Sequence, residues 1–332
     1  MVYQSIIRVL QFAAVDVSNT SEVSVARIRK QLNAEFAMAE SGMLTIDDIH
    51  YNKHDVMEEI ERPDFVERLS YHQKVWDHKT LLELLENDSI DIYESYKEWY
   101  VLHQEPGFVH FLSPYFAFSF NSVMKTLLHM PHFSEATNWL KFTVFLEPQH
   151  EEQAYEATRI FLNEQLHLFN NVNKDTFYRH INDIRMWERE PWGDFINQLP
   201  DSLFTYIDDI GVAIINFTAQ VQRTERDMCE RMSFQLMRLT RISPENRKII
   251  QDNHRIFTKQ GASSSSSNVS IGSILFGIAF VLKLLFALGN CNGQSLTPTN
   301  VYYNYDPHQD TLWQLEQGKY LLDSVTSIPS AQ

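Results

Sequence analysis

Residues 263–290, SSSSSNVSIGSILFGIAFVLKLLFALGN, decide the architecture, because five serines lead there into nineteen mostly apolar residues. A helix of nineteen residues rises about 28 Å, which matches the roughly 30 Å hydrocarbon core of a bilayer. Within residues 271–289, twelve side chains are Ile, Leu, Phe or Val, and their favourable insertion outweighs the cost of one lysine. The sequence therefore predicts a transmembrane helix at 271–289. The alternative is a buried core helix of a soluble domain.

The residues around this stretch favour the transmembrane interpretation. Residues 259–270 contain GASSSSSN, which has the composition of a flexible linker and rarely introduces a core helix. Lysines and arginines precede the span, and none lies between residues 290 and 318. By the positive-inside rule, residues 1–258 form a cytoplasmic domain and residues 290–332 form a short tail outside. We expect a single-pass membrane protein.

Charge is distributed unevenly before the span. Residues 1–222 carry 17 Lys and Arg against 34 Asp and Glu, whereas residues 223–260 carry 9 against 5. A basic segment next to a span can meet anionic lipid, although an ordinary solvated helix face explains the same charges. The juxtamembrane basic residues in question are Arg238, Arg241, Arg247, Lys248, Arg255 and Lys259.

The acidic body and the cysteine count exclude several classes of protein. The net charge is −15, and nucleic-acid binding is not expected because it needs a basic face. Cys229 and Cys291 are too few for a disulfide framework or a four-thiolate zinc site, which indicates a reducing compartment for the body. Cys291 follows the span on the expected outer side, where it is either an interchain disulfide partner or an unpaired thiol.

Lys283 lies within the predicted span and shares one face with small and polar residues. At 100° per residue these positions fall within a sector of roughly 80°. Small residues let a second helix approach closely, and a polar group is then satisfied across the contact. The predicted contact face, for a second copy or a partner helix, is Gly272, Ala279, Lys283, Ala287 and Asn290. The alternative is that Lys283 only extends toward the nearer interface.

Helical periodicity dominates the body, so the expected fold class is all-α, a multi-helix domain followed by one transmembrane helix. One small β-hairpin is predicted, in which 44–46 and 49–51 flank Asp47-Asp48 and a helix begins near Asn52 or Asp55. The longest helix is predicted over 201–241, with its first half in the core and its second half emerging toward the membrane. Other helices are predicted over 90–102, 108–129, 133–145, 150–170, 174–189 and 244–257.

Catalytic motifs are scarce. The chain has neither a glycine-rich phosphate loop nor a GxSxG motif, which excludes Rossmann, P-loop, kinase and α/β-hydrolase enzymes. Glu164 and His167 form an E-x-x-H pair on a predicted helix, but helical di-iron proteins use two such pairs with further glutamates. A lone pair arises by chance in acidic helices. No catalytic residue, cofactor or small-molecule substrate is predicted.

These observations favour a membrane-anchored helical scaffold or adaptor, which binds a protein partner or self-associates through its membrane helix. Two alternatives stay open. One is a metal-dependent helical enzyme using Glu164 and His167. The other is an accessory subunit of a membrane transport complex, in which Lys283 pairs with a carboxylate of a neighbouring span. The sequence leaves enzymatic activity open and favours a function without it.

Lys283 provides the test of the helix contact. We expect Lys283→Leu to weaken the complex without affecting membrane insertion, because a cross-helix polar contact is lost while the span becomes more apolar. Co-purification from detergent-solubilised membranes measures the complex, and Lys283→Arg is the charge-conserving control. If Lys283→Leu yields as much complex as the natural chain, the helix contact is refuted. The lysine then only extends its charged end to the membrane surface.

Overall fold

The structure, a computed structural model, describes residues 2–16, 25–39, 42–87, 96–129, 132–189 and 191–259. The chain divides into two units, Met1–Ser264 and Ser265–Gln332, and all described residues belong to the first. The predicted span 271–289 and tail 290–332 lie outside the described residues, as do Lys283 and Cys291. Within those described ranges, no helix combines the length and apolarity needed to cross a membrane.

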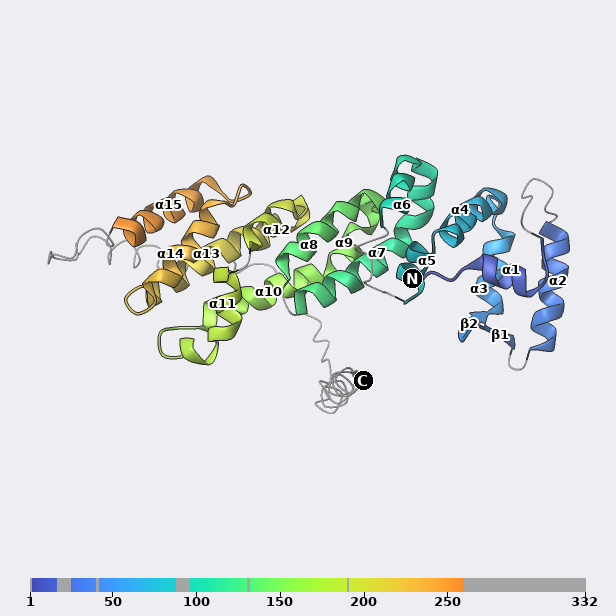
Figure 1. Cartoon of the computed structure of the whole chain (residues 1–332), viewed down its shortest axis with the longest axis horizontal. Coiled ribbons are helices and arrows are strands. Elements are labelled where there is room, and N and C mark those ends of the chain that lie inside the picture. The colour runs from blue at the N-terminus through green and yellow to red at the C-terminus, as the bar shows by residue number, and fades with distance from the viewer. Residues whose placement is uncertain are drawn as a thin grey trace, which may run out of the picture. The chain divides into compact units, whose positions relative to one another are not determined.

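The described part of the chain is helical apart from one small hairpin, which confirms the all-α prediction (Figure 1). Short 3-10 segments extend several helices: η4 (Val101–Gln104), η5 (Leu140–Phe145), η6 (Pro148–His150), η7 (Phe177–Arg179) and η8 (Asp201–Leu203). The first helices are α1 (Ile6–Phe12), α2 (Val25–Met38), α3 (Lys53–Glu61), α4 (Phe65–Asp77), α5 (Lys79–Asn87), α6 (Tyr96–Tyr100) and α7 (Pro106–His129). The later helices are α8 (Phe133–Trp139), α9 (Glu151–Ala154), α10 (Glu156–Asn171), α11 (Ile181–Arg189), α12 (Trp192–Gln198), α13 (Phe204–Val221), α14 (Arg226–Met237) and α15 (Pro244–Lys259).

The predicted hairpin is present. Strands β1 (Met43–Ile46) and β2 (Ile49–Asn52) pair antiparallel, with Ile46 opposite Ile49. Asp47 and Asp48 both have positive φ, 50° and 64°, as a two-residue type I′ turn requires. The Asn52 side chain then caps α3 by accepting a hydrogen bond from the His54 backbone N–H.

Helices mostly pack on helices that are close to them in sequence. Helix α7 contacts α4, α5, α8, α9 and α10, and α10 in turn packs on α13. Helices α13, α14 and α15 contact one another, and α14 also touches α11 and α12 (Figure 1). The N-terminal helix α1 is an exception, because it packs on α4 across more than fifty residues of chain.

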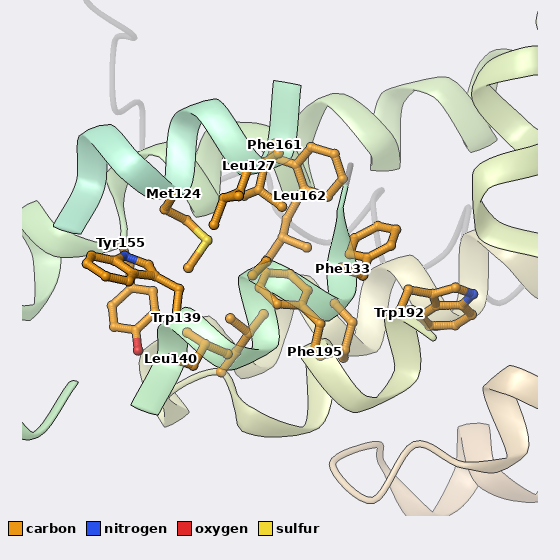
Figure 2. Packing of buried hydrophobic residues seen from close by; sticks show 14 of the residues in the cluster. Met124, Leu127, Phe133, Trp139, Leu140, Tyr155, Phe161, Leu162, Trp192 and Phe195 are labelled. Carbon is orange, nitrogen blue, oxygen red and sulfur yellow. The ribbon is translucent and has the colours of Figure 1, made fainter. Parts of the chain in front are cut away.

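The described residues bury two hydrophobic clusters. The smaller cluster joins α1 to α4 and the hairpin, and the larger runs from Val75 to Phe257 and includes Tyr3. Trp76 packs against both clusters. In the larger one, side chains of α7, α8, α10 and α12 meet, as Figure 2 shows. The indoles of Trp139 and Trp192 donate to backbone carbonyls, so these large rings are buried without losing a hydrogen bond.

The prediction of one continuous helix over 201–241 is wrong. The chain turns at residues 222–225, between α13 and α14, and α14 folds back onto α13. The turn buries Met228, Cys229, Met232 and Leu236, which a continuous helix would carry away from α13. The gain from burying this apolar stripe outweighs the helical propensity of the turn residues.

The turn of the hairpin gives a test of the fold. We expect Asp48→Val to lower the free energy of unfolding by about 1–2 kcal/mol, because a β-branched residue is strained at positive φ. Asp48→Asn tolerates this conformation and is the matched control. Urea unfolding of both variants measures the difference. Equal stability of the two variants would mean that the turn does not adopt this conformation.

Candidate functional site

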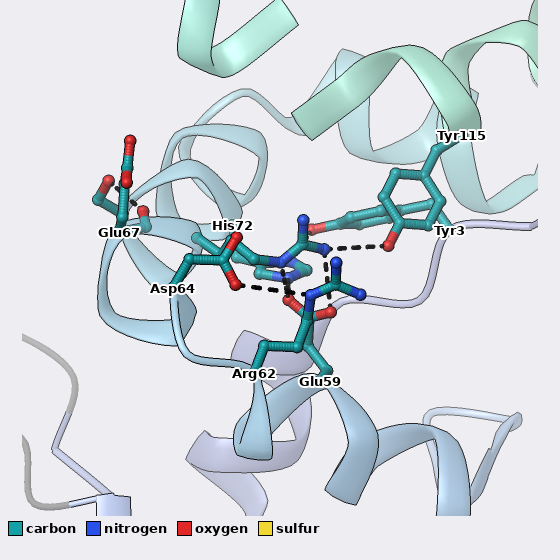
Figure 3. Close-up of polar contacts among 9 residues, drawn as sticks. Tyr3, Glu59, Arg62, Asp64, Glu67, His72 and Tyr115 are labelled. Atoms are coloured by element: carbon teal, nitrogen blue, oxygen red, sulfur yellow. Dashed lines mark hydrogen bonds and ion pairs between the residues drawn. The ribbon is translucent and has the colours of Figure 1, made fainter. Parts of the chain in front are cut away.

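Titratable side chains from four segments converge next to the N-terminal segment. Figure 3 shows Tyr3, Glu59 of α3, His72 of α4 and Tyr115 of α7 close together. Arg68 of α4 completes the cluster through its hydrogen bonds to Glu59 and Tyr115. The spacing of Arg68 and His72, four residues apart on α4, places both side chains on one helix face. Their common partner is the carboxylate of Glu59, at the C-terminal end of α3.

Glu59 is saturated by these neighbours. Arg68 donates to both carboxylate oxygens at 2.6 and 2.9 Å, and His72 Nε2 lies 3.1 Å from Oε1. On the other side of the imidazole, His72 Nδ1 lies 2.8 Å from the Tyr3 hydroxyl. Arg68 also reaches the Tyr115 hydroxyl at 3.4 Å. The cluster is closed, because each group faces another member of it.

The pKa shifts fix where the protons lie. Burial opposes ionisation of Glu59, but hydrogen bonds from His72 and Arg68 outweigh it and lower the pKa of Glu59 to about 2. Burial lowers the pKa of His72, and it raises the pKa of Tyr3 well above its usual value. The neutral Tyr3 hydroxyl therefore donates to Nδ1 of neutral His72, which donates from Nε2 to ionised Glu59.

A second buried carboxylate holds the same N-terminal segment. Glu86 of α5 is 4% exposed and pairs with Arg8 through two hydrogen bonds of 3.0 and 2.9 Å. It also accepts from the backbone N–H of Ser5 at 3.2 Å. Arg8 additionally donates to the Tyr51 hydroxyl at 3.1 Å, which ties the segment to the hairpin.

The buried cluster is better suited to holding the fold than to catalysis. The hydroxyl of Tyr3, the imidazole of His72 and the carboxylate of Glu59 are hydrogen-bonded in series, as in an acid–base relay. However, Tyr3 is only 1% and His72 only 2% exposed. No substrate atom reaches either group, and the Glu59 oxygens are taken by Arg68 and His72. General acid–base catalysis needs a group within hydrogen-bond reach of the substrate.

A pocket lies elsewhere, where η7 and α11 meet the turn before α14. Its volume is about 390 Å³, it is open to solvent, and six of its ten lining residues are charged. Arg231 donates to Glu188 at 2.7 Å, and Tyr178 donates to Glu225 at 2.9 Å. The charged lining residues are Arg185, Glu188, Glu225, Arg226, Asp227 and Arg231. The pocket therefore presents both signs of charge to solvent.

Two charges of the pocket are free to bind. Arg226 donates to the carbonyl oxygen of Phe257 at 2.7 and 3.2 Å, which ties the start of α14 to α15. Across the described ranges, Arg185 and Asp227 have no hydrogen-bond or ion-pair partner, and both are exposed. This pair is what a bound molecule can engage without breaking an existing contact.

The metal pair predicted from sequence lies on the solvent side of α10. Glu164 and His167 are both exposed and share one face of that helix. The described residues contain no group of three or more His, Cys, Asp or Glu side chains arranged to hold a metal ion. The E-x-x-H pair is therefore without a third ligand in that part of the chain.

Several of the predicted juxtamembrane arginines form ion pairs within the body. Arg238 pairs with Asp194, and Arg241 pairs with Asp201. These acids and Glu188, the partner of Arg231, lie outside residues 223–260, so counting all three changes that segment's balance from 9 against 5 to 9 against 8. Arg255 pairs with Asp252 within α15, and Arg247 donates to the carbonyl oxygen of Thr240.

Lys248 is exposed, and the contacts of the described residues give it no partner. Lys259 ends α15, and its side chain lies outside the described part of the structure. The predicted membrane face, Gly272 to Asn290, lies wholly outside it. The lipid-binding role of these residues stays a prediction.

Sequence reasoning missed the buried cluster and the pocket. Arg68 and His72 carried a signal, because their spacing predicts one helix face, but Glu59 and Tyr3 join them only through tertiary packing. The pocket brings together α11 and α14, which are about forty residues apart in the chain. No local pattern marks such a meeting.

Comparisons with known proteins bring no family to this chain. No protein-family model, curated protein or solved structure matches it.

The buried cluster predicts acid sensitivity. The folded pKa of His72 lies below its ordinary 6.5 and that of Glu59 lies at about 2, below 4.5, so unfolding takes up protons at both groups in acid. Stability should be full above pH 6.5, decline below it as unfolded His72 protonates, and decline further from 4.5 toward 2. Urea unfolding of the full chain in detergent at a series of pH values measures this.

A pair of histidine variants identifies the source of the first decline. His72→Gln keeps a donor and an acceptor but does not titrate, so its stability should change less between pH 6.5 and 5. His110→Gln is the control, because His110 is 75% exposed and pairs with Glu147 on the surface. If both variants keep the decline of the natural chain, the buried histidine is not its cause.

Proposed function

We propose that this chain is a membrane-anchored helical scaffold, whose cytoplasmic body binds a protein partner. Residues 271–289 provide the anchor in this proposal, and the pocket between α11 and α14 provides the binding surface. The observation that carries it is the charged lining of that pocket, with Arg185 and Asp227 lacking partners among the described residues.

The lining favours a protein segment over a small molecule. Small-molecule sites are enclosed and lined mostly by apolar and aromatic side chains, whereas six of ten residues here are charged. Opposite charges placed side by side select a partner by electrostatic complementarity and suppress wrong partners. A polar segment that carries both an acidic and a basic side chain fits this arrangement.

The interior of the body supports a binding role over an enzymatic one. The two buried carboxylates, Glu59 and Glu86, are each paired with an arginine inside the protein. Their side chains fix the N-terminal segment and are closed to substrate. The pocket, in contrast, presents the exposed side chains of Arg185 and Asp227 to solvent.

Replacing Arg185 tests the binding surface. We expect Arg185→Glu to reduce recovery of the partner by about tenfold, because the reversal places like charge opposite the partner's acidic group. The measurement is quantitative co-purification of the tagged full-length chain from detergent-solubilised membranes. Lys125→Glu is the matched control, since Lys125 of α7 is also exposed and undergoes the same charge change.

Three outcomes separate the parts of the proposal. A partner lost in Arg185→Glu and kept in Lys125→Glu supports the pocket. A partner kept equally in both means that another surface binds it. A chain that elutes alone contradicts the scaffold function. Deleting residues 261–332 then tells whether binding needs the anchor, because the body without it retains the pocket.

A further inference from the structure

Two apolar side chains lie uncovered side by side on α14. Phe234 is 55% and Met237 38% exposed, and their spacing of three residues places them on one helix face. Among the described residues, the other exposed phenylalanines are Phe12 and Phe204, at the ends of different helices. A single exposed apolar residue is ordinary, whereas two neighbours on one helix face form a small apolar patch.

The pair lies on the helix that packs against α15, the last helix of the described residues. Phe234 stands against His254 of α15, with ring centroids 6.5 Å apart, and Ser233 lies 2.8 Å from the same imidazole. His254 is five residues before the end of α15 at Lys259, about 8 Å along the helix. Arg226, at the start of α14, meets Phe257 near the end of α15, so the two helices run antiparallel and Phe234 lies about two turns of α14 away from the point where α15 ends.

That exit point limits the distance to the bilayer. Twelve residues take the chain from Lys259 to Ile271, where the predicted span begins, and even fully extended they reach only about 40 Å. The tether keeps a weak contact populated, because it converts docking into an intramolecular event at high effective concentration. The helices that pack on α15 are α13 and α14, and Ile160 of α10, which is comparably exposed, lies on neither of them.

The charges around the pair suit an anionic lipid surface. Arg231 and Arg238 lie three residues before Phe234 and one residue after Met237, and both are more than a third exposed despite their ion pairs. Lys248 of α15 is exposed and has no partner within the described ranges. Asp227 and Glu230 gather at the other end of α14, so the basic end is the one that carries Met237.

We propose that the exposed face of α14, with Phe234 and Met237 at its centre, docks into the headgroup region of the bilayer that holds residues 271–289. The apolar pair enters the interface, and Arg238 and Lys248 meet lipid phosphates. The proposal rests on the membrane anchoring proposed above. Since Arg231 of α14 also lines the pocket, docking orients the pocket relative to the membrane.

Lipid-borne quenchers test the docking in the full-length chain. Phe234→Cys in a Cys291→Ser background is labelled with an environment-sensitive fluorophore, and the remaining Cys229 is buried and leaves the label specific. The chain is reconstituted in vesicles of phosphatidylcholine and phosphatidylserine that carry a quencher at the headgroup level. Ile160→Cys, at a residue 50% exposed on α10, is the matched control, and Met237→Cys is a second reporter.

We expect quenching at Phe234→Cys and Met237→Cys at least twofold stronger than at Ile160→Cys, and weaker quenching in phosphatidylcholine alone. Equal quenching at all three positions overturns the docking. A label at 234 that shifts to shorter wavelength without lipid quenching also overturns it, because a protein surface or second copy then covers the face. Extraction with alkaline carbonate tests separately whether residues 271–289 anchor the chain in the membrane. Release of the chain refutes the anchor, while the quenching still decides the docking.

Discussion

The ionised carboxylate of Glu59 is the group on which the N-terminal half of the body depends. A carboxylate that is only 15% exposed is costly unless it is paired, and here Arg68 and His72 pair it from one face of α4. The same imidazole then holds Tyr3, which belongs to the large hydrophobic cluster, while Ile6 to Ala13 belong to the small one. Glu86 repeats the arrangement with Arg8. The carboxylates of Glu59 and Glu86 thus hold the segment that runs from Tyr3 in the large cluster to Ala13 in the small one.

The sequence predicted those parts of the fold whose signals are local. Helix α15, predicted over 244–257 and found at Pro244–Lys259, and the hairpin with Asp47-Asp48 at its turn depend on periodicity and turn chemistry within about ten residues. The end of α13 was missed because residues 222–225 contain neither glycine nor proline. That turn exists because Met228 and Leu236 find a surface on α13, which is a tertiary cause. Helix α12 was missed as well, since seven residues are too few to show a period.

The candidate site was beyond sequence reasoning for a related reason. Charge counted along residues 223–260 gives a basic segment, but charge in space includes Asp194 and Asp201, which meet Arg238 and Arg241 across some forty residues. The pocket likewise brings α11 against the start of α14. The local sequence pattern shows which charged residues share a helix face. Only the packing of the helices decides which of these residues are already paired with opposite charges on other helices.

The ion pairs that hold the N-terminal segment and the pair of Arg238 at the end of α14 differ in burial, and this difference bears on function. Arg8–Glu86 and Arg68–Glu59 are largely buried, so breaking either leaves an uncompensated charge in the interior. Around α14, Arg238–Asp194 is 39% and 47% exposed, and exposed pairs contribute only about 0–1 kcal/mol each. A contact of that strength can be exchanged for one with a partner or a lipid at little cost. Rearrangement on binding is therefore expected around α14, where the pocket and the apolar pair lie, and not around the N-terminal segment.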